Sequence, residues 1–110
     1  MVINQGDIIL LNFDPQSGHE QSGVRPALVI SNRILNKSKG MAMVCPITNT
    51  DRVCPFRVQL DKRTKTKGFI QCDQARILDV YSRNPKFIEK VPKEIILKCI
   101  NIVGIFIEEE

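Results

Sequence analysis

The chain has no tryptophan, one tyrosine and one histidine. A single histidine, and four cysteines without a Cys-x-x-Cys pair, speak against a zinc site, which needs several such ligands at close spacing. The apolar stretch near the N-terminus is too short for a membrane span and lacks the basic start of a signal peptide. We therefore expect a cytoplasmic protein with no metal or cofactor, whose cysteines are reduced thiols packed as small apolar side chains.

The remaining composition is that of an ordinary globular protein. Of 110 residues, 43% are hydrophobic and 25% are charged, which predicts one domain spanning residues 1–110. The formal net charge of +4 is compatible with a polyanionic partner, although charge alone is weak evidence. The basic run KRTKTK at residues 62–67 is more typical of a solvated hairpin turn than of a phosphate-binding site.

Short apolar runs separated by turn residues predict a small, mostly antiparallel sheet or barrel. We expect strands over residues 8–13, 27–31, 41–47, 56–60 and 68–72, and a further short one over 76–80. Residues 32–39 form a loop or a short helix. After Pro92 the apolar residues recur at helical spacing, at Ile95, Cys99, Ile102 or Val103, and Phe106. This pattern predicts one C-terminal helix packed on the sheet.

A long polar loop precedes the second strand. Residues 14–24 read DPQSGHEQSGV, and Arg25-Pro26 follows them directly. Because the residue before a proline is restricted to extended geometry, we expect Arg25 to enter the strand already straightened. The loop therefore gathers a histidine, a carboxylate and an amide next to an anchored guanidinium.

Four segments together resemble the MazF/PemK toxins of bacterial toxin–antitoxin systems. They are GDIILLNFDPQSGHEQSGVRPALVIS (residues 6–31), MVCPITN (43–49), PFRVQL (55–60) and GFIQCDQARIL (68–78). The resemblance runs from Gly6 to about Gly104. The chain is most similar to the PemK-like branch because of His19, the triplet Cys72-Asp73-Gln74 and the segment from Arg83 through Lys93-Glu94.

The resemblance implies an SH3-like β-barrel of the MazF/PemK/CcdB type with a C-terminal helix, assembled as a homodimer. It also implies metal-independent cleavage of single-stranded RNA at short preferred sequences, which inhibits translation and growth. The products would carry a 5′-hydroxyl and a 2′,3′-cyclic phosphate, or a 3′-phosphate after ring opening. A cognate MazE/PemI-like antitoxin would block the site with an acidic segment.

Arg25 and Thr48 are the first candidates for the catalytic residues. A guanidinium matches two phosphate oxygens in a bidentate arrangement and retains its proton, so we assign Arg25 to stabilising the charge of the transition state. Thr48 ends a predicted strand, where its hydroxyl could contact a phosphate or simply satisfy a turn. The family places a functional threonine at this position.

The loop supplies four further candidates. His19 belongs to the residue type that transfers protons near neutral pH, but a solvated loop histidine is an equal alternative. Glu20 could act as a base or could hold Arg25 in place. Gln21 and Ser22 offer hydrogen bonds to RNA bases or to the RNA backbone.

The segment after the strand at residues 68–72 supplies the remaining candidates. In the PemK-like branch, the aspartate that matches Asp73 is assigned as a base. Close to Arg25, Asp73 would stay ionised and be a weaker base. A purely structural role in a turn is equally plausible. Gln74, Arg76 and Phe56 are candidate RNA contacts. At Gln71 this branch often has an arginine, and a glutamine cannot supply that charge.

Two other functions fit the same fold. A gyrase-directed toxin similar to CcdB depends on a C-terminal end containing tryptophan, which this chain lacks because it ends in IFIEEE. A non-catalytic SH3-like module that binds nucleic acid or protein would use the polar loop only as a binding edge. Neither the cleavage sequence nor the identity of the antitoxin follows from these residues.

Overall fold

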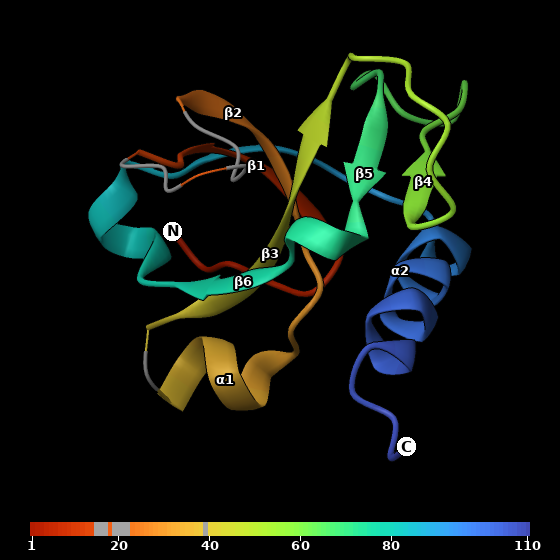
Figure 1. Ribbon diagram of the computed structural model, residues 1–110. Helices are drawn as coiled ribbons and strands as arrows, with labels where there is room; N and C mark the ends of the chain where they lie inside the picture. Colours follow the sequence, from red (N-terminus) through yellow and green to blue (C-terminus); the bar gives the residue numbers. More distant parts are fainter. Residues whose placement is uncertain (15–17, 19–22, 39) are drawn as a thin grey trace.

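The computed structural model describes residues 1–14, 18, 23–38 and 40–110, in which a bent antiparallel sheet packs against two helices (Figure 1). The strands are β1 (Asp7–Asn12), β2 (Val24–Val29), β3 (Ala42–Thr48), β4 (Arg57–Gln59), β5 (Phe69–Gln71), β6 (Arg76–Leu78) and β7 (Lys86–Lys90). The helices are α1 (Arg33–Ser38) and α2 (Lys93–Ile105), with 3₁₀ turns η1 (Cys72–Gln74) and η2 (Val80–Arg83). The strand order is β4-β5-β3-β2-β1-β7, and β6 pairs with the first half of β3.

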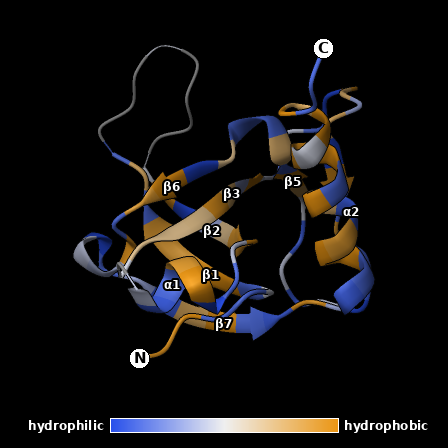
Figure 2. Cartoon of the chain, turned by 90° about the horizontal axis from the view of Figure 1, so that it is seen from below, coloured by the Kyte–Doolittle hydropathy of each residue, from blue (hydrophilic) through white to orange (hydrophobic). Residues whose placement is uncertain are grey.

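The strands at the centre of the sheet are hydrophobic on both faces. In β3, Cys45 and Ile47 belong to one buried cluster, whereas Ala42 and Val44 belong to another. Since successive side chains of a strand point to opposite faces, β3 separates two hydrophobic cores. Figure 2 shows the hydrophobic colour running through β1, β2 and β3 in the middle of the molecule.

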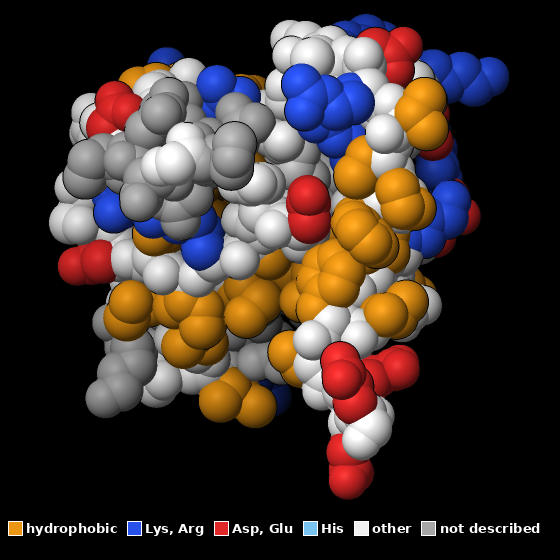
Figure 3. All heavy atoms as spheres, in the orientation of Figure 1, with side chains coloured by type: hydrophobic (Ala, Val, Ile, Leu, Met, Phe, Trp, Pro, Cys, Tyr) orange, Lys and Arg blue, Asp and Glu red, His pale blue; other side chains and the backbone are white. Residues whose placement is uncertain are grey.

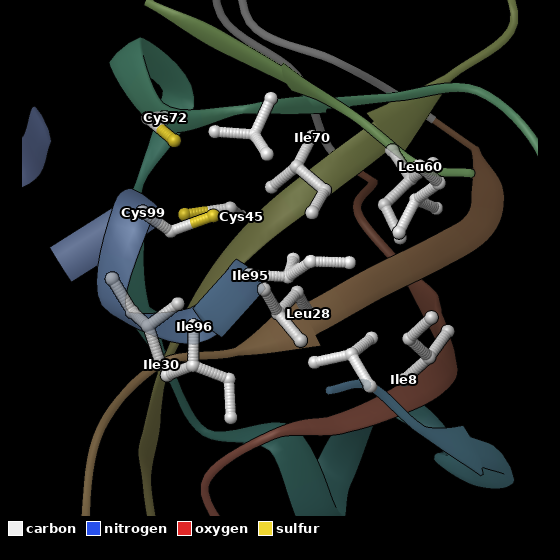
Figure 4. Close-up of a cluster of buried hydrophobic side chains, with 13 residues drawn as sticks. Ile8, Leu28, Ile30, Cys45, Leu60, Ile70, Cys72, Ile95, Ile96 and Cys99 are labelled. Carbon is white, nitrogen blue, oxygen red and sulfur yellow. The ribbon is translucent and has the colours of Figure 1, made fainter. Parts of the chain in front are cut away.

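The first core lies between the sheet and α2. Ile95 of α2 is buried in a cluster with Ile8, Leu28 and Ile70, which come from three different strands (Figure 4). The helix begins directly after Pro92, as a proline at a helix start favours. Burial of these aliphatic side chains therefore fixes α2 on one face of the sheet.

Three cysteine side chains of this core come together from β3, η1 and α2. Figure 4 shows the sulfur atoms of Cys45, Cys72 and Cys99 turned toward one another, and all three thiols are free. Hydrogen bonding with Cys72, together with burial, raises the pKa of the Cys45 and Cys99 thiols. Cys45 and Cys99 are therefore packed as protonated thiols, as expected. The expectation of burial is wrong for Cys54, which is only partly covered.

The second core lies on the opposite face of β1, β2 and β3. Ile9, Leu11 and Phe13 are fully buried there together with Val29 and Val44. Leu78 and Val80, from β6 and η2, cover the cluster. The same face of the sheet continues past this core to Arg25 and Thr48, at the ends of β2 and β3.

The predicted strands are confirmed with shifts of one to three residues at their ends. The short-helix alternative for residues 32–39 is correct, since α1 spans Arg33–Ser38, and residues 61–67 form a turn. β7 was not predicted, because three of its five residues are charged and only Glu89 is not exposed. Such a composition is typical of an edge strand, and β7 pairs only with β1. Phe106 follows the end of α2 and is 43% exposed, not buried as the helical spacing predicted.

The basic turn at residues 61–67 is held against the rest of the fold. The Glu89 carboxylate accepts hydrogen bonds from the backbone N–H groups of Lys65 and Thr66, at 3.0 and 2.7 Å. Arg63 forms ion pairs with Asp61 and with Glu94 of α2. The turn is therefore a structural connection between β4 and β5. In the described part of the chain, no helix is long and apolar enough to cross a lipid bilayer.

Candidate active site

A polar cavity of about 460 Å³ opens beside the C-terminal end of β3. Its described lining comes from β2, β3, β4, β5, η1 and the connection between β3 and β4. The lining residues are Arg25, Thr48, Thr50, Arg52, Val53, Cys54, Arg57, Gln71, Asp73 and Gln74. Three guanidinium groups and one carboxylate give this lining a positive balance, which suits an anionic ligand.

Strand register places the central side chains on one face. Arg25 pairs with Leu11, which belongs to the second core, and directly opposed residues share a face of an antiparallel sheet. Ala27 of β2 pairs with Pro46 of β3, and the same antiparallel register two residues further along brings Arg25 beside Thr48. Arg25 and Thr48 thus lie on the same face of the sheet as the second core, and the cavity begins where the buried hydrophobic residues of that face end.

Thr48 fulfils the turn-stabilising alternative predicted from the sequence and also lines the cavity. Its side chain is buried, with 7% of the residue exposed, and its Oγ1 accepts a hydrogen bond of 3.2 Å from the N–H of Thr50. This bond uses the oxygen as an acceptor, so the hydroxyl proton can still be donated to a ligand in the cavity. Thr48 therefore stabilises the turn after β3 and also presents a donor.

Arg57 is held in the cavity wall by two contacts. Its Nη1 donates a hydrogen bond of 2.7 Å to the carbonyl oxygen of Thr50, and its guanidinium lies 6.0 Å from the centre of the Phe69 ring. These contacts leave the charge in place while restricting the side chain. Arg52 lies on the exposed connection between β3 and β4 and lines the same cavity.

The segment β5-η1 supplies the other wall. Gln71 ends β5 with only 4% of the residue exposed, and its Oε1 accepts no hydrogen bond from the residues that the structure describes. Asp73 follows in the first turn of η1 and is exposed, with Gln74 beside it. The structure thus brings Asp73 and Gln74 to the same cavity as Arg25 and Thr48.

Two of the candidate RNA contacts lie elsewhere. Phe56 packs edge-to-face against Phe106, with ring centres 5.0 Å apart, and does not line the cavity. Arg76 is partly buried on β6 opposite Val44 and does not line it either. Both predictions relied on residue type and proximity in sequence, which carry no information on direction.

The candidates His19, Glu20, Gln21 and Ser22 lie outside the described residues. The described residues that flank them are well anchored. Gly23 donates an N–H to Asp14 Oδ1 at 2.8 Å, and Arg83 Nη1 donates to the Asp14 carbonyl at 2.9 Å. Arg83 therefore joins the start of this loop to η2.

Five lining residues were not among the predicted site residues. They are Thr50, Arg52, Val53, Cys54 and Arg57. Only Arg57 had a usable signal, since the alternation in PFRVQL puts it on the face opposite the buried Val58. Within the described parts of the chain, no three His, Cys, Asp or Glu side chains are grouped so that they could hold a metal ion.

Comparison with known proteins places this fold and cavity in a class of small toxins. The chain superposes on a crystal structure of MazF from Deinococcus radiodurans with a TM-score of 0.91, at 34% identity and with 96% of each chain covered. A MazE–MazF crystal structure from the same organism gives a TM-score of 0.84, also at 34% identity and 96% coverage of both chains. The expected fold class is thereby confirmed.

Sequence comparison gives the family. The Escherichia coli protein named endoribonuclease PemK is 37% identical over 97 residues, which covers 84% of this chain and 73% of PemK. The model of the family described as "PemK-like, MazF-like toxin of type II toxin-antitoxin system" matches residues 4–107. The chain therefore belongs to the PemK/MazF family of type II toxins.

Proposed function

We propose that this protein is an endoribonuclease toxin that cleaves single-stranded RNA. The observation that carries the proposal is the cavity in which a guanidinium, a hydroxyl and a carboxylate converge, from Arg25, Thr48 and Asp73. These groups belong to β2, β3 and η1, and two of the three elements are strands of one rigid sheet. The names of the similar proteins support the same activity.

The proposed reaction uses the ribose 2′-hydroxyl as the nucleophile. Its oxygen attacks the neighbouring phosphorus, its proton passes to a protein base, and the bond from phosphorus to the 5′-oxygen breaks. The departing oxygen takes up a proton, which leaves a 2′,3′-cyclic phosphate and a 5′-hydroxyl. The protein must therefore stabilise a dianionic phosphorane and move two protons.

Each described side chain has a part in this scheme. Arg25 pairs with two phosphate oxygens, and Thr48 donates its hydroxyl proton to one of them. Asp73 is the carboxylate of the described lining and accepts the 2′-hydroxyl proton. His19 and Glu20 are the further candidates for proton transfer, and Gln21, Ser22 and Gln74 for contacts to the RNA.

The same positive lining suits the antitoxin. A peptide carrying carboxylates would pair with Arg52 and Arg57 and would exclude RNA from the cavity. Such inhibition agrees with the existence of MazE–MazF complexes among the similar structures. We place this toxin–antitoxin pair in the cytoplasm, where its substrate would be mRNA.

A second surface supports a homodimer. An apolar groove of about 500 Å³ lies between α1 and α2 and includes Ile34, Leu35, Ile100, Val103 and Ile107. Figure 3 shows hydrophobic side chains gathered along this side of the molecule, in the orientation of Figure 1. Exposed apolar surface of this kind is typical of protein interfaces, and a second copy of the chain is the proposed occupant.

RNA cleavage in the presence of EDTA tests the proposed activity. We expect the wild-type protein to cut a single-stranded transcript and Arg25→Ala to reduce cleavage by at least about a hundredfold, as loss of a transition-state donor does. Arg33→Ala is the matched control, because Arg33 is an exposed arginine at the start of α1 and lies outside the cavity. RNA that stays intact but bound would favour the non-catalytic alternative, and full activity of Arg25→Ala would remove Arg25 from the mechanism.

A further inference from the structure

Gln71 has a buried acceptor that the fold does not satisfy. The residue is 4% exposed at the end of β5, and its Oε1 receives no hydrogen bond from the described residues. Buried polar atoms without a partner are rare in native proteins because they lose their hydration without compensation. Gln71 also lines the cavity that contains Arg25 and Thr48. The missing partner is therefore to be sought in a ligand of that cavity.

The neighbouring strands leave little alternative. On one side Gln71 pairs with Arg57, whose guanidinium donates to the Thr50 carbonyl oxygen and makes no hydrogen bond to Gln71 Oε1. On the other side, the register that pairs Ile47 with Ile70 brings Gln71 opposite Pro46. A proline has no N–H to donate and presents only an apolar ring. Neither neighbouring strand thus supplies the donor.

The chemistry of RNA restricts what can bind this oxygen. Phosphate oxygens are acceptors, so they pair with the guanidinium groups of the lining and are repelled by an amide oxygen. The donors of RNA are the N–H groups of the bases and the 2′-hydroxyls. The proton of the attacking hydroxyl must pass to a base, and a neutral amide is a poor base. An amide instead carries an acceptor and donors side by side, which is the pattern on base edges.

We propose that Gln71 determines sequence specificity by accepting a hydrogen bond from a base N–H of the nucleotide next to the scissile phosphate. This inference rests on the proposed nuclease function and adds the residue that reads the base. Cleavage should accordingly depend on the identity of one nucleotide through Gln71.

The test compares cleavage-site preferences of matched variants. Gln71→Met keeps an unbranched side chain of similar length but removes the amide, and Gln71→Glu keeps the acceptor. Gln59→Met is the control, because Gln59 lies on neighbouring β4, is exposed and does not line the cavity. Each protein digests a pool of transcripts with varied sequence in EDTA, and cleavage is mapped at the 5′-ends. Rates are also measured at the preferred site and at its single-base variants.

We expect Gln71→Met to slow cleavage at the preferred site by about ten- to a hundredfold, the range of one good base contact. At the RNA site whose base lacks the N–H donor, Gln71→Met should cleave at nearly the wild-type rate. The ratio of the two cleavage rates, which measures discrimination at that nucleotide, should therefore fall toward one. Gln71→Glu should retain the same base preference, and Gln59→Met should behave like the wild type. Thermal melts establish that each variant is folded, and Gln71→Glu still tests the base preference if Gln71→Met does not fold.

Three results would overturn the proposal. A uniform loss of rate in Gln71→Met with unchanged site preference would make Gln71 a packing residue. A loss of base preference in Gln71→Glu would show that the acceptor does not read the base. A substrate with a single 2′-deoxyribose, placed at a nucleotide other than the one that supplies the attacking hydroxyl, would place the donor on the sugar if it abolished the difference between wild type and Gln71→Met. Wild-type protein that cuts no transcript would instead refute the nuclease function itself.

Discussion

Gly68 connects the stability of the sheet to the position of Thr48. Its φ of +121° lies in a region that residues with a side chain rarely adopt. A Cβ at this position would collide with the Thr48 carbonyl oxygen and would lie 3.0 Å from Asn49 Oδ1. Phe69, which follows Gly68, pairs directly with Thr48 in the β3–β5 ladder. A backbone change at Gly68 is therefore adjacent to Thr48. Gly68→Ala should therefore disturb both folding and activity.

The free energy of unfolding that Gly68→Ala should lose has two causes. Holding a residue with a side chain in a glycine-only backbone region costs about 1–3 kcal/mol. Relief of the collision displaces the Thr48 carbonyl, which raises the expected loss of unfolding free energy to about 2–4 kcal/mol. A domain of this size has about 5–15 kcal/mol in total, so the variant should fold but melt roughly 10–20 °C lower. Misplacement of the Thr48 hydroxyl by about 1 Å should slow cleavage on the order of a hundredfold below the melting range.

Thermal melts and initial cleavage rates measured on the same preparations test this reasoning. Gln59→Ala is the control, because Gln59 is exposed on neighbouring β4 and does not line the cavity. That substitution should leave the free energy of unfolding within about 0.5 kcal/mol of the wild-type value, as exposed substitutions usually do. The reasoning is refuted if Gly68→Ala melts with the wild type and cleaves at the wild-type rate.

Two further predictions concern Glu89 and Ile34. Burial tends to raise the pKa of Glu89, but hydrogen bonds from the Thr66 side chain and from the backbone N–H groups of Lys65 and Thr66 outweigh it and lower this pKa below the usual 4.5. The stabilisation by Glu89 is therefore complete well above pH 4.5 and is lost as the pH falls below it. Glu89→Gln should lower the free energy of unfolding by about 1 kcal/mol at pH 7. It should also weaken the fall of that free energy at acid pH, measured by urea unfolding at several pH values, and an unchanged fall would exclude this contribution. Ile34→Glu places a charge in the apolar groove and should convert the proposed dimer to a monomer in sedimentation experiments, whereas a persistent dimer would locate the interface elsewhere.

Local chemistry explains which parts of the fold the sequence could predict. The strands of the core alternate or run hydrophobic between turn residues, so β1, β2 and β3 leave a clear pattern. β7 leaves none, because an edge strand with solvent around it can carry charges at Lys86, Glu89 and Lys90. Its pairing with β1 is a tertiary fact that no short window of residues contains.

The candidate site divides in the same way. Arg25 could be found because Pro26 fixes its geometry and the surrounding motif is specific. Arg52 and Cys54 could not, because the connection between β3 and β4 has neither periodicity nor a motif, and only the folded chain turns it toward Thr48. Such loops carry function without leaving a propensity signal.

The shared face of the sheet explains how a small protein can hold a charged site firmly. Along β3, Val44 and Pro46 are buried in the interior, and Thr48, two residues further on the same face, lines the cavity. Arg25 has the same relation to Ala27 and Val29 on β2. On each strand, the buried residue beside the polar residue on this face thus fixes the direction in which the polar side chain leaves the sheet. Core packing therefore directs Arg25 and Thr48 toward the cavity before any RNA binds, which is the preorganisation that electrostatic catalysis requires.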